Sequence, residues 1–306
     1  MSRFQYFLFL IVVIISLTSA GCLQERSIPD INEQIPTIQQ ERMLQQLNWV
    51  TDDTQSSLDG LDYSVDEFAT LVGMTGISGL ETDAALTDLA TYHPAIINVI
   101  IYDPNGTILS AAPDHAKGLI GHTLNKNESV NTTLVTKKPS MSNLIPLAEG
   151  GEGAVLDYPI FSTDGDFIGV VSMAFSPHSL ISPITEVAME WAPYTYMVAQ
   201  TNGRILYHTN PDLVGKETFN EATFADFPDI LELAKQYSTN RSGYDTFTFY
   251  SIGSDKIVQK ETYWSTTSLH GTEWRVLIFR GDIRGISAHL PMWYKGDHIG
   301  ARLFQR

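Results

Sequence analysis

Histidine and acidic side chains gather in one short stretch of the sequence. Asp114 and His115 are adjacent, and His122 follows in the same polar segment. Neutral imidazole and carboxylate groups are ligands that suit Zn²⁺. This spacing matches no recognised metal signature, however, and histidines in a loop are more often solvated. We therefore predict no metal and no cofactor, and a metal site at these three residues is the alternative.

The sequence contains few signs of covalent or acid–base catalysis. The chain has no G-x-S-x-G nucleophile elbow, which a typical serine hydrolase would carry. Its one cysteine, Cys22, lies at the end of an N-terminal apolar leader. No spacing among the 35 acidic residues singles out a pair for acid and base roles. We predict a binding protein rather than an enzyme, with a hydrolase as the less favoured alternative.

One carboxylate interrupts an otherwise apolar segment. Asp157 lies within AVLDYPIF at residues 154–161, a pattern typical of a buried strand. A carboxylate is costly to bury unless it is paired, hydrogen-bonded or neutralised. Asp157 could therefore accept a hydrogen bond from a cationic or hydroxylated ligand. The alternatives are an edge strand that faces water and a bond to neighbouring backbone.

The first 21 residues have the layout of a secretory signal peptide. Arg3 precedes an apolar run at residues 4–17, and small residues follow. Ser19-Ala20-Gly21-Cys22 resembles the lipobox of lipoproteins, with serine where leucine is usual. We therefore predict lipidation of Cys22 and a lipid anchor on the extracytoplasmic face of the membrane. An uncleaved anchor and an unmodified thiol are the alternatives.

Charge restricts the partners. The chain carries 19 basic and 35 acidic side chains, for a net charge of −16. Nucleic acid is excluded as a partner, because its affinity depends on Lys and Arg that neutralise phosphates.

Helical and strand patterns occupy different parts of the chain. Apolar spacing predicts helices at 38–61, 64–72 (opened by a capping box at Ser64), 81–92, 184–191 and 224–237. Runs rich in β-formers, several of them separated by turn residues, predict strands at 99–102, 107–109, 154–161, 166–175, 196–199, 204–207, 244–250, 257–264 and 274–279. Because strands and crossover helices do not alternate, we predict an α+β fold with antiparallel sheets and helices outside them.

A short internal repeat runs through this pattern. Residues 103–109 (DPNGTIL), followed by Ile120-Gly121, recur as residues 200–206 (QTNGRIL), followed by Val214-Gly215. Each copy opens a half that continues with a helical insert and further strands. The repeat predicts two halves of one kind.

These segments resemble the double Cache family of extracytoplasmic sensor modules. The resemblance spans residues 38–280 and is carried, in order, by Tyr92-His93-Pro94 with 99–109, Tyr158-Pro159-Ile160-Phe161 with 164–165 and 169–175, 202–207, 260–264 and 269–275. It implies two PAS-like subdomains, each a roughly five-stranded antiparallel sheet, packed along a long N-terminal helix. A ligand cleft is implied between each sheet and the segment joining its second and third strands. Typical ligands of the family are amino acids, carboxylates, amines and other small metabolites.

The resulting organisation has six parts. They are a signal peptide (1–21), a lipid-anchored tether (22–37), an N-terminal helical segment (38–94), a first, distal subdomain (95–182), a second, proximal subdomain (183–285) and a C-terminal tail (286–306).

The resemblance places candidate ligand contacts in both predicted clefts. In the first subdomain they are Tyr102, at a strand end, His115, on the covering loop, Asp157 and Tyr158; in the second they are Tyr207, Tyr263, Trp264 and His270. The alternative for the aromatic residues is that they pack the core.

Two departures from the family restrict the prediction. Residues 91–182 contain no arginine, so an amino-acid carboxylate would lack its usual bidentate partner. No second apolar run that could span a membrane follows, so we expect ligand occupancy to pass to a separate membrane partner, such as a receptor kinase, a chemoreceptor or a transporter. The prediction is a lipid-anchored sensor for a small metabolite. The alternatives are a substrate-capture lipoprotein for a transporter, a structural spacer and, less favoured, a hydrolase.

Overall fold

The computed structural model describes residues 38–124, 128–221, 224, 226–250 and 256–281. The predicted signal peptide, Cys22, the tether and the tail at 286–306 lie outside the described residues. The chain divides into two compact units, residues 1–41 and 42–306. Only residues 38–41 of the first unit are described, and the contacts reported below lie within the second.

One long helix, α2 (Ile38–Thr75), carries the N-terminal apolar pattern. Its buried side chains recur at helical spacing and include Leu47, Val50, Leu58, Leu61, Val65, Phe68 and Val72. The predicted break at Ser64 is wrong, because this apolar stripe continues past it. The Ser64 hydroxyl donates to the Leu61 carbonyl oxygen at 2.7 Å, and this bond accommodates a capping-type residue inside the helix.

Two antiparallel sheets follow the helical segment, which ends with α3 (Leu80–Ala90). The first sheet contains β1 (Ile96–Tyr102), β2 (Ile108–Ala112), β3 (Ser140–Met141), β4 (Ile145–Pro146), β5 (Glu152–Phe161) and β6 (Phe167–Phe175). The second contains β7 (Thr195–Gln200), β8 (Ile205–His208), β9 (Gly243–Tyr250), β10 (Ile257–Leu269) and β11 (Thr272–Arg280). The strand orders are β2-β1-β6-β5-β3, with β4 also paired to β5, and β8-β7-β11-β10-β9. The two orders are equivalent, so the predicted α+β fold of two five-stranded halves is confirmed.

Further helices connect the strands. They are η1 (Asp114–Leu119), α4 (Glu128–Thr136), α5 (Pro177–Trp191), η2 (Pro211–Leu213) and α6 (Pro228–Thr239). α5 begins seven residues earlier than predicted, since the Ser176 hydroxyl accepts a hydrogen bond from the Ser179 amide and caps it. The predicted helix at 224–237 begins at Pro228, because proline suits the first turn of a helix.

The repeat found in the sequence recurs as a set of matching hydrogen bonds. The Gly121 amide donates to the Ile108 carbonyl oxygen, and the Gly215 amide donates to that of Ile205, both at 2.8 Å. Gly106 (φ +90°) and Gly203 (φ +92°) take the same left-handed conformation in the turn between the first two strands of each sheet. Each half therefore closes its first hairpin, and the segment after it, in the same way.

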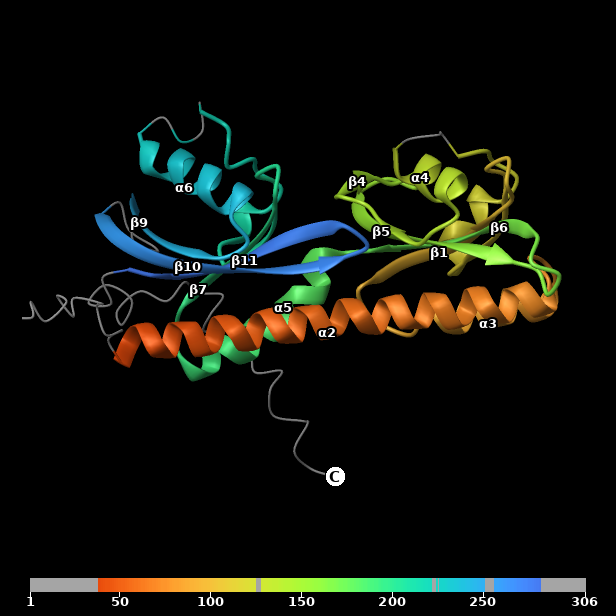
Figure 1. The fold of residues 1–306 in the computed structure, drawn as a ribbon, viewed down its shortest axis with the longest axis horizontal. Helices are drawn as coiled ribbons and strands as arrows, with labels where there is room; N and C mark the ends of the chain where they lie inside the picture. The colour runs from red at the N-terminus through yellow and green to blue at the C-terminus, as the bar shows by residue number, and fades with distance from the viewer. Residues whose placement is uncertain (1–37, 125–127, 222–223, 225, 251–255, 282–306) are drawn as a thin grey trace, which may run out of the picture. The chain divides into compact units, whose positions relative to one another are not determined.

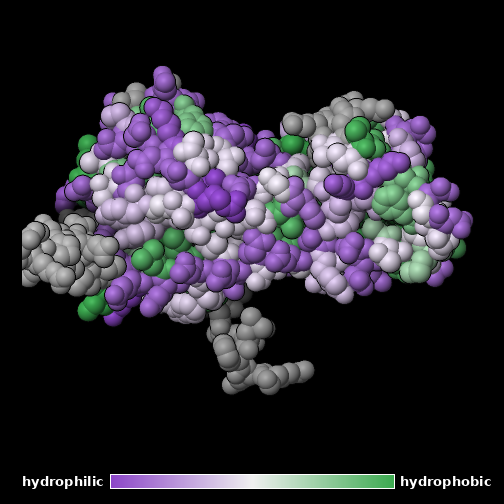
Figure 2. Space-filling view, in the orientation of Figure 1, coloured by the Kyte–Doolittle hydropathy of each residue, from purple (hydrophilic) through white to green (hydrophobic). Residues whose placement is uncertain are grey.

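Each sheet is covered on both faces. α2 and α5 lie on one side of the sheets, and α4 and α6 lie on the other (Figure 1). A large apolar cluster joins the first side of both sheets to α2 and α5. Smaller clusters lie on the other side, one in the first half and one, which includes residues of α6, in the second. Among the described helices, none combines the length and apolar character needed to cross a membrane. The face seen in Figure 2 is mostly hydrophilic, with apolar residues in small separate groups.

A close approach between α2 and β5 gives a testable consequence for stability. A Cβ atom on Gly73 would overlap the carbonyl oxygen of Phe161. We expect Gly73→Ala to lower the free energy of unfolding by about 2 kcal/mol, because overpacking forces the backbone apart. Urea denaturation measures the change. Gly60→Ala in the same helix is the control, since its nearest neighbour is the Tyr92 hydroxyl at 4.0 Å. That variant should be stabilised by about 1 kcal/mol through helix propensity. Equal effects of the two substitutions would contradict the close approach.

Candidate ligand-binding site

A row of side chains, three of them polar, crosses the first sheet on the face covered by α4. The strand register places Ile100, Ser172, Asp157 and Ser140 opposite one another on β1, β6, β5 and β3. Directly opposed residues of antiparallel strands share a face. The Ser140 hydroxyl lies 2.7 Å from that of Thr133 on α4. Asp157 has no exposed surface, so this row puts a carboxylate inside the first half, between the sheet and α4.

Tyr102 lies beside this row at the end of β1. Its side chain is fully buried, and its ring packs in the apolar cluster with Ile108, Ala116 and Val170. Among the residues that the structure describes, none forms a hydrogen bond with its hydroxyl group. Burial raises the pKa of Tyr102 far above its usual value, and the negative charge of Asp157 raises it further. The hydroxyl is therefore neutral at physiological pH and has an unused donor.

The arrangement joins a polar end to an apolar wall. The polar end consists of the Asp157 carboxylate, the Tyr102 hydroxyl and the hydroxyls of Ser140, Ser172 and Thr133. The apolar wall comes from Ile100, Ile108, Ala111, Val170, Leu119 and Leu134. A few polar groups within an apolar lining is the usual construction of a small-molecule site. Asp157 can bind a cationic or hydroxylated group, and Tyr102 can donate a hydrogen bond beside it.

The structure keeps His115 away from this cluster. It lies in η1 with its side chain exposed, and the next residue, Ala116, is the one that points into the core. The tight turn of η1 turns adjacent residues to different sides, which the sequence pattern did not reveal. Asp114 pairs with Lys117 at 2.7 Å on the surface. Within the described ranges, no three His, Cys, Asp or Glu side chains converge as metal ligands would, so the alternative at Asp114, His115 and His122 gains no support.

Tyr158 follows Asp157 in sequence but faces the opposite way, toward α2. Its hydroxyl donates to the Asp62 carboxylate at 2.5 Å and lies 3.2 Å from Nε2 of His270. The same Asp62 oxygen lies 2.6 Å from His270 Nε2. Burial, then the hydrogen bond to Asp62, raises the pKa of Tyr158. We call Tyr158, Asp62 and His270 the junction, because they join β5, α2 and the β10–β11 turn.

A groove of about 440 Å³ lies on the same side as the junction. It runs between α2 and the end of β5, and its lining includes Asp66, Gly73, Met74, Lys137, Tyr158 and Phe161. Asp157 does not line it. Of the first-half candidates, the structure therefore brings Tyr102 and Asp157 together and places Tyr158 on the other face of the sheet.

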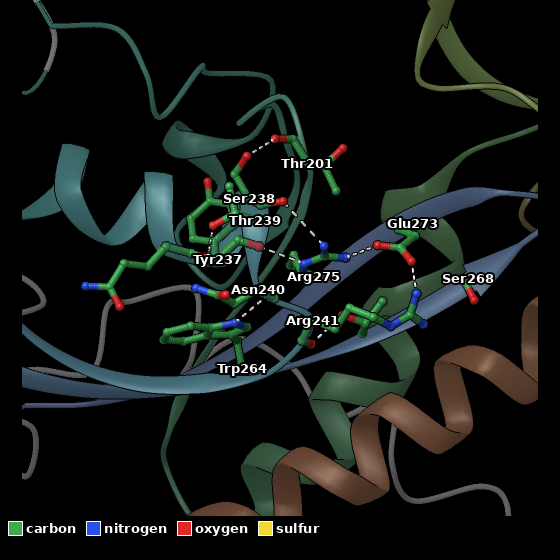
Figure 3. A network of polar contacts seen from close by, with 12 residues as sticks. Thr201, Tyr237, Ser238, Thr239, Asn240, Arg241, Trp264, Ser268, Glu273 and Arg275 are labelled. Atoms are coloured by element: carbon green, nitrogen blue, oxygen red, sulfur yellow. Dashed lines mark hydrogen bonds and ion pairs between the residues drawn. The ribbon is translucent and has the colours of Figure 1, made fainter.

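The candidates in the second half have structural partners. The Trp264 indole donates to the Asn240 carbonyl oxygen at 3.0 Å, next to the buried Arg275 (Figure 3). Tyr207 is buried toward α5, where its hydroxyl accepts a hydrogen bond from Thr185 at 2.6 Å. The ring of Tyr263 packs on that of Tyr244, with centroids 4.7 Å apart. With His270 in the junction, these four do not form one cluster.

Three polar residues of the site were missed from the sequence: Ser140, Ser172 and Thr133. A hydroxyl residue is common in strands and helices, so Ser140 and Thr133 give no signal in the sequence. Ser172 does lie in the apolar run GVVSMAF, where a polar residue gave the same signal as Asp157. The register then places it directly opposite Asp157.

The unpartnered hydroxyl of Tyr102 leads to a prediction without any ligand. We expect Tyr102→Phe to raise the free energy of unfolding by about 1 kcal/mol, because a buried polar group without a partner is destabilising. Tyr158→Phe is the matched control and should lower it by about 1 kcal/mol, since it removes a hydrogen bond to a carboxylate. Urea titrations of both variants measure the difference. A loss of stability in Tyr102→Phe equal to that of the control would show that the hydroxyl is already satisfied.

Comparison with known proteins supports this description of the fold. Residues 56–177 match the model of a family described as "HK/GC/Chemotaxis protein-like, sensor domain". The chain is similar to an extracellular ligand binding receptor from Desulfohalobium retbaense, with 24% identity and a TM-score of 0.65, over 78% of this chain and 40% of that one. It thus spans less than half the length of that receptor. No curated protein matches it in sequence.

Two chemoreceptor domains have the same fold. The ligand-binding domain of the Pseudomonas aeruginosa amino acid chemoreceptor PctB, in complex with L-Arg, is 16% identical with a TM-score of 0.57, over 83% of this chain and 91% of that one. The periplasmic sensory domain of the Campylobacter jejuni chemoreceptor Tlp1 is 13% identical with a TM-score of 0.55, over 82% of this chain and 97% of that one. The predicted resemblance to two-subdomain sensor modules is confirmed by this fold and by the family match.

Proposed function

We propose that this chain is an extracytoplasmic sensor module that binds a small molecule in its first half, between the sheet and α4. A hydroxyl group of the ligand donates a hydrogen bond to the Asp157 carboxylate and accepts one from the Tyr102 hydroxyl, whereas an ammonium group donates to both side chains. The observation that carries the proposal is the Tyr102 hydroxyl, which is fully buried beside a buried carboxylate and has no partner among the described residues. Such groups mark a place where another polar molecule completes the hydrogen bonding.

The charge of the site restricts the ligand class. Residues 91–182 contain no arginine, and the acidic group of the site is Asp157. An anionic ligand would meet a carboxylate without a compensating guanidinium, which disfavours it. The L-Arg bound to the PctB domain therefore does not indicate the ligand of this chain. We propose amines, polyols and similar cationic or hydroxylated metabolites.

The strand that carries Asp157 also connects the site to α2 and to the second half. Asp157 and Tyr158 are adjacent on β5 and point to opposite faces, as neighbouring strand residues do. A ligand that shifts Asp157 would therefore also shift Tyr158, which contacts Asp62 on α2 and His270 in the second half. Occupancy of the first half would in this way bias the position of α2.

The cellular setting extends this proposal. We propose that Cys22 is lipidated after removal of the signal peptide, so that the module is anchored on the extracytoplasmic face of the membrane. The fold is shared with sensory domains of chemoreceptors, one of them periplasmic. A membrane partner, a receptor kinase, a chemoreceptor or a transporter, would then read the occupied state.

A thermal-shift screen of the full chain in detergent tests the proposal. The library should contain amines, polyols, neutral amides and carboxylates at matched concentrations. A ligand at about 100 times its dissociation constant should raise stability by roughly 2.7 kcal/mol. We expect amines or polyols to give such shifts and to lose them in Tyr102→Phe and Asp157→Asn. Shifts from these classes that survive both substitutions would contradict the proposed site.

A further inference from the structure

The second sheet carries an unusual basic residue on the face that α6 covers. Lys260 on β10 lies opposite Phe247 on β9 in the strand register. Phe247 belongs to the apolar cluster of this face, together with Met197 of β7. His208 on β8 lies opposite Met197, so both basic side chains share one face of the sheet.

Lys260 is a cation without an acidic partner among the described residues. Its ammonium nitrogen lies 5.5 Å from the centre of the Phe249 ring, and its side chain is half-buried. It forms no ion pair with a described carboxylate, although the chain has 35 acidic residues. Burial lowers the pKa of Lys260 to about 8, and no acidic group offsets this effect.

His208 contributes a second donor on the same face of the sheet. Its Nδ1 accepts a hydrogen bond from the Asn210 amide at 2.8 Å, so the neutral ring carries its proton on Nε2. Burial, and then the positive charge of Lys260, lowers the pKa of His208 to about 3, so the ring is neutral at physiological pH. The ring stacks on Phe279, with centroids 6.3 Å apart and an interplanar angle of 26°. The Nε2–H group has no partner among the described residues.

We propose that the second half binds a small organic carboxylate with an apolar body, held by Lys260 and His208. The ammonium group would pair with the carboxylate, and the Nε2–H group of His208 would donate a second hydrogen bond to it. The aromatic rings of Phe249 and Phe279 would contact the apolar body. A free phosphate fits less well, because it offers nothing to these rings and needs more donors than the two found here.

This inference is independent of the site in the first half. Lys260 and His208 lie on the second sheet, and neither takes part in the junction. The two sites also select opposite charges, since the first contains a carboxylate and the second a lysine. An experiment that contradicts one proposal therefore does not contradict the other. Asp157→Asn should not change binding at Lys260.

Calorimetric titration of the full chain with matched probes tests the inference. The probes are phenylacetate and hexanoate, each compared with its neutral amide. We expect the carboxylates to bind at least about tenfold more tightly than the amides, because a charge-assisted hydrogen bond is lost in the amide. Lys260→Met should bring the carboxylates down to the level of the amides. Lys137→Met is the matched control, since Lys137 also lies over a ring, that of Phe167 at 5.3 Å, but is exposed.

A second measurement on the unmodified sequence locates the bound carboxylate. Acetylation of lysines, followed by mass spectrometry, should modify Lys260 readily at pH 8 and more slowly when phenylacetate is present. Lys137 should be modified at the same rate with and without the probe. Carboxylates that bind no better than their amides, or binding that Lys260→Met leaves unchanged, would overturn the inference. So would modification of Lys260 at one rate in the presence and absence of phenylacetate.

Discussion

Asp157→Asn is expected to weaken the binding of a cationic ligand by about 100-fold, because it removes one partner of a buried charge pair. Asparagine has nearly the same shape as aspartate, so Ser140 and Ser172, which lie opposite residue 157 in the strand register, should keep their positions. The change removes the negative charge that lies beside the Tyr102 hydroxyl. Isothermal titration with the amine that gives the largest thermal shift measures the loss.

A matched substitution separates the local charge from the overall charge of the protein. Asp164→Asn makes the same chemical change in the exposed turn between β5 and β6. It should leave affinity within about twofold, because exposed charges are screened by salt. Equal losses in the two variants would mean that the ligand responds to the net charge of −16 rather than to a site. Unchanged affinity in Asp157→Asn would place the ligand elsewhere.

Arg275→Met is expected to lower the free energy of unfolding by about 3 kcal/mol, the largest loss of stability among the changes considered. Arg275 is almost fully buried, and its guanidinium binds the end of α6 to the second sheet (Figure 3). It donates to the Tyr237 carbonyl oxygen at 2.7 Å and to the Glu273 carboxylate at 2.8 Å. Methionine would fill the space but leave buried acceptors without donors. Urea denaturation measures the loss.

The control for this prediction lies in the same network. Arg241 also contacts Glu273, but its side chain is 62% exposed. Arg241→Met should cost less than about 1 kcal/mol, as exposed ion pairs usually do. If both variants lower the free energy of unfolding by the same amount, the buried contacts of Arg275 with the end of α6 do not stabilise the protein as predicted.

The duplicated fold could be predicted from the sequence because it depends on local signals. Asparagine–glycine turns in the repeat, at residues 105–106 and 202–203, lie between β-rich runs, and the structure closes both with the same hydrogen bonds. Helix boundaries were less predictable. Ser64 carries a strong start signal, yet the apolar stripe of α2 continues through it, since packing against both sheets outweighs a local cap.

The site could be predicted only in part. Asp157 was visible because a carboxylate in an apolar run is costly to bury, and Tyr102 was visible as a strand-end aromatic residue. Which face each residue takes was not visible. Tyr158 contacts Asp62 and His270, at sequence separations of 96 and 112 residues. A single sequence gives no signal for such long-range pairs, and the same holds for the placement of Lys260 and His208 on one face of the second sheet.

The most direct test of the central claim is a crystal structure of the chain with the best-stabilising amine or polyol. The account predicts that the ligand lies between the first sheet and α4, with a nitrogen or hydroxyl group within hydrogen-bonding distance of the Asp157 carboxylate and the Tyr102 hydroxyl. A structure in which that ligand lies only in the groove beside Gly73 and Lys137, with the Asp157 side of the sheet closed and unchanged, would contradict it.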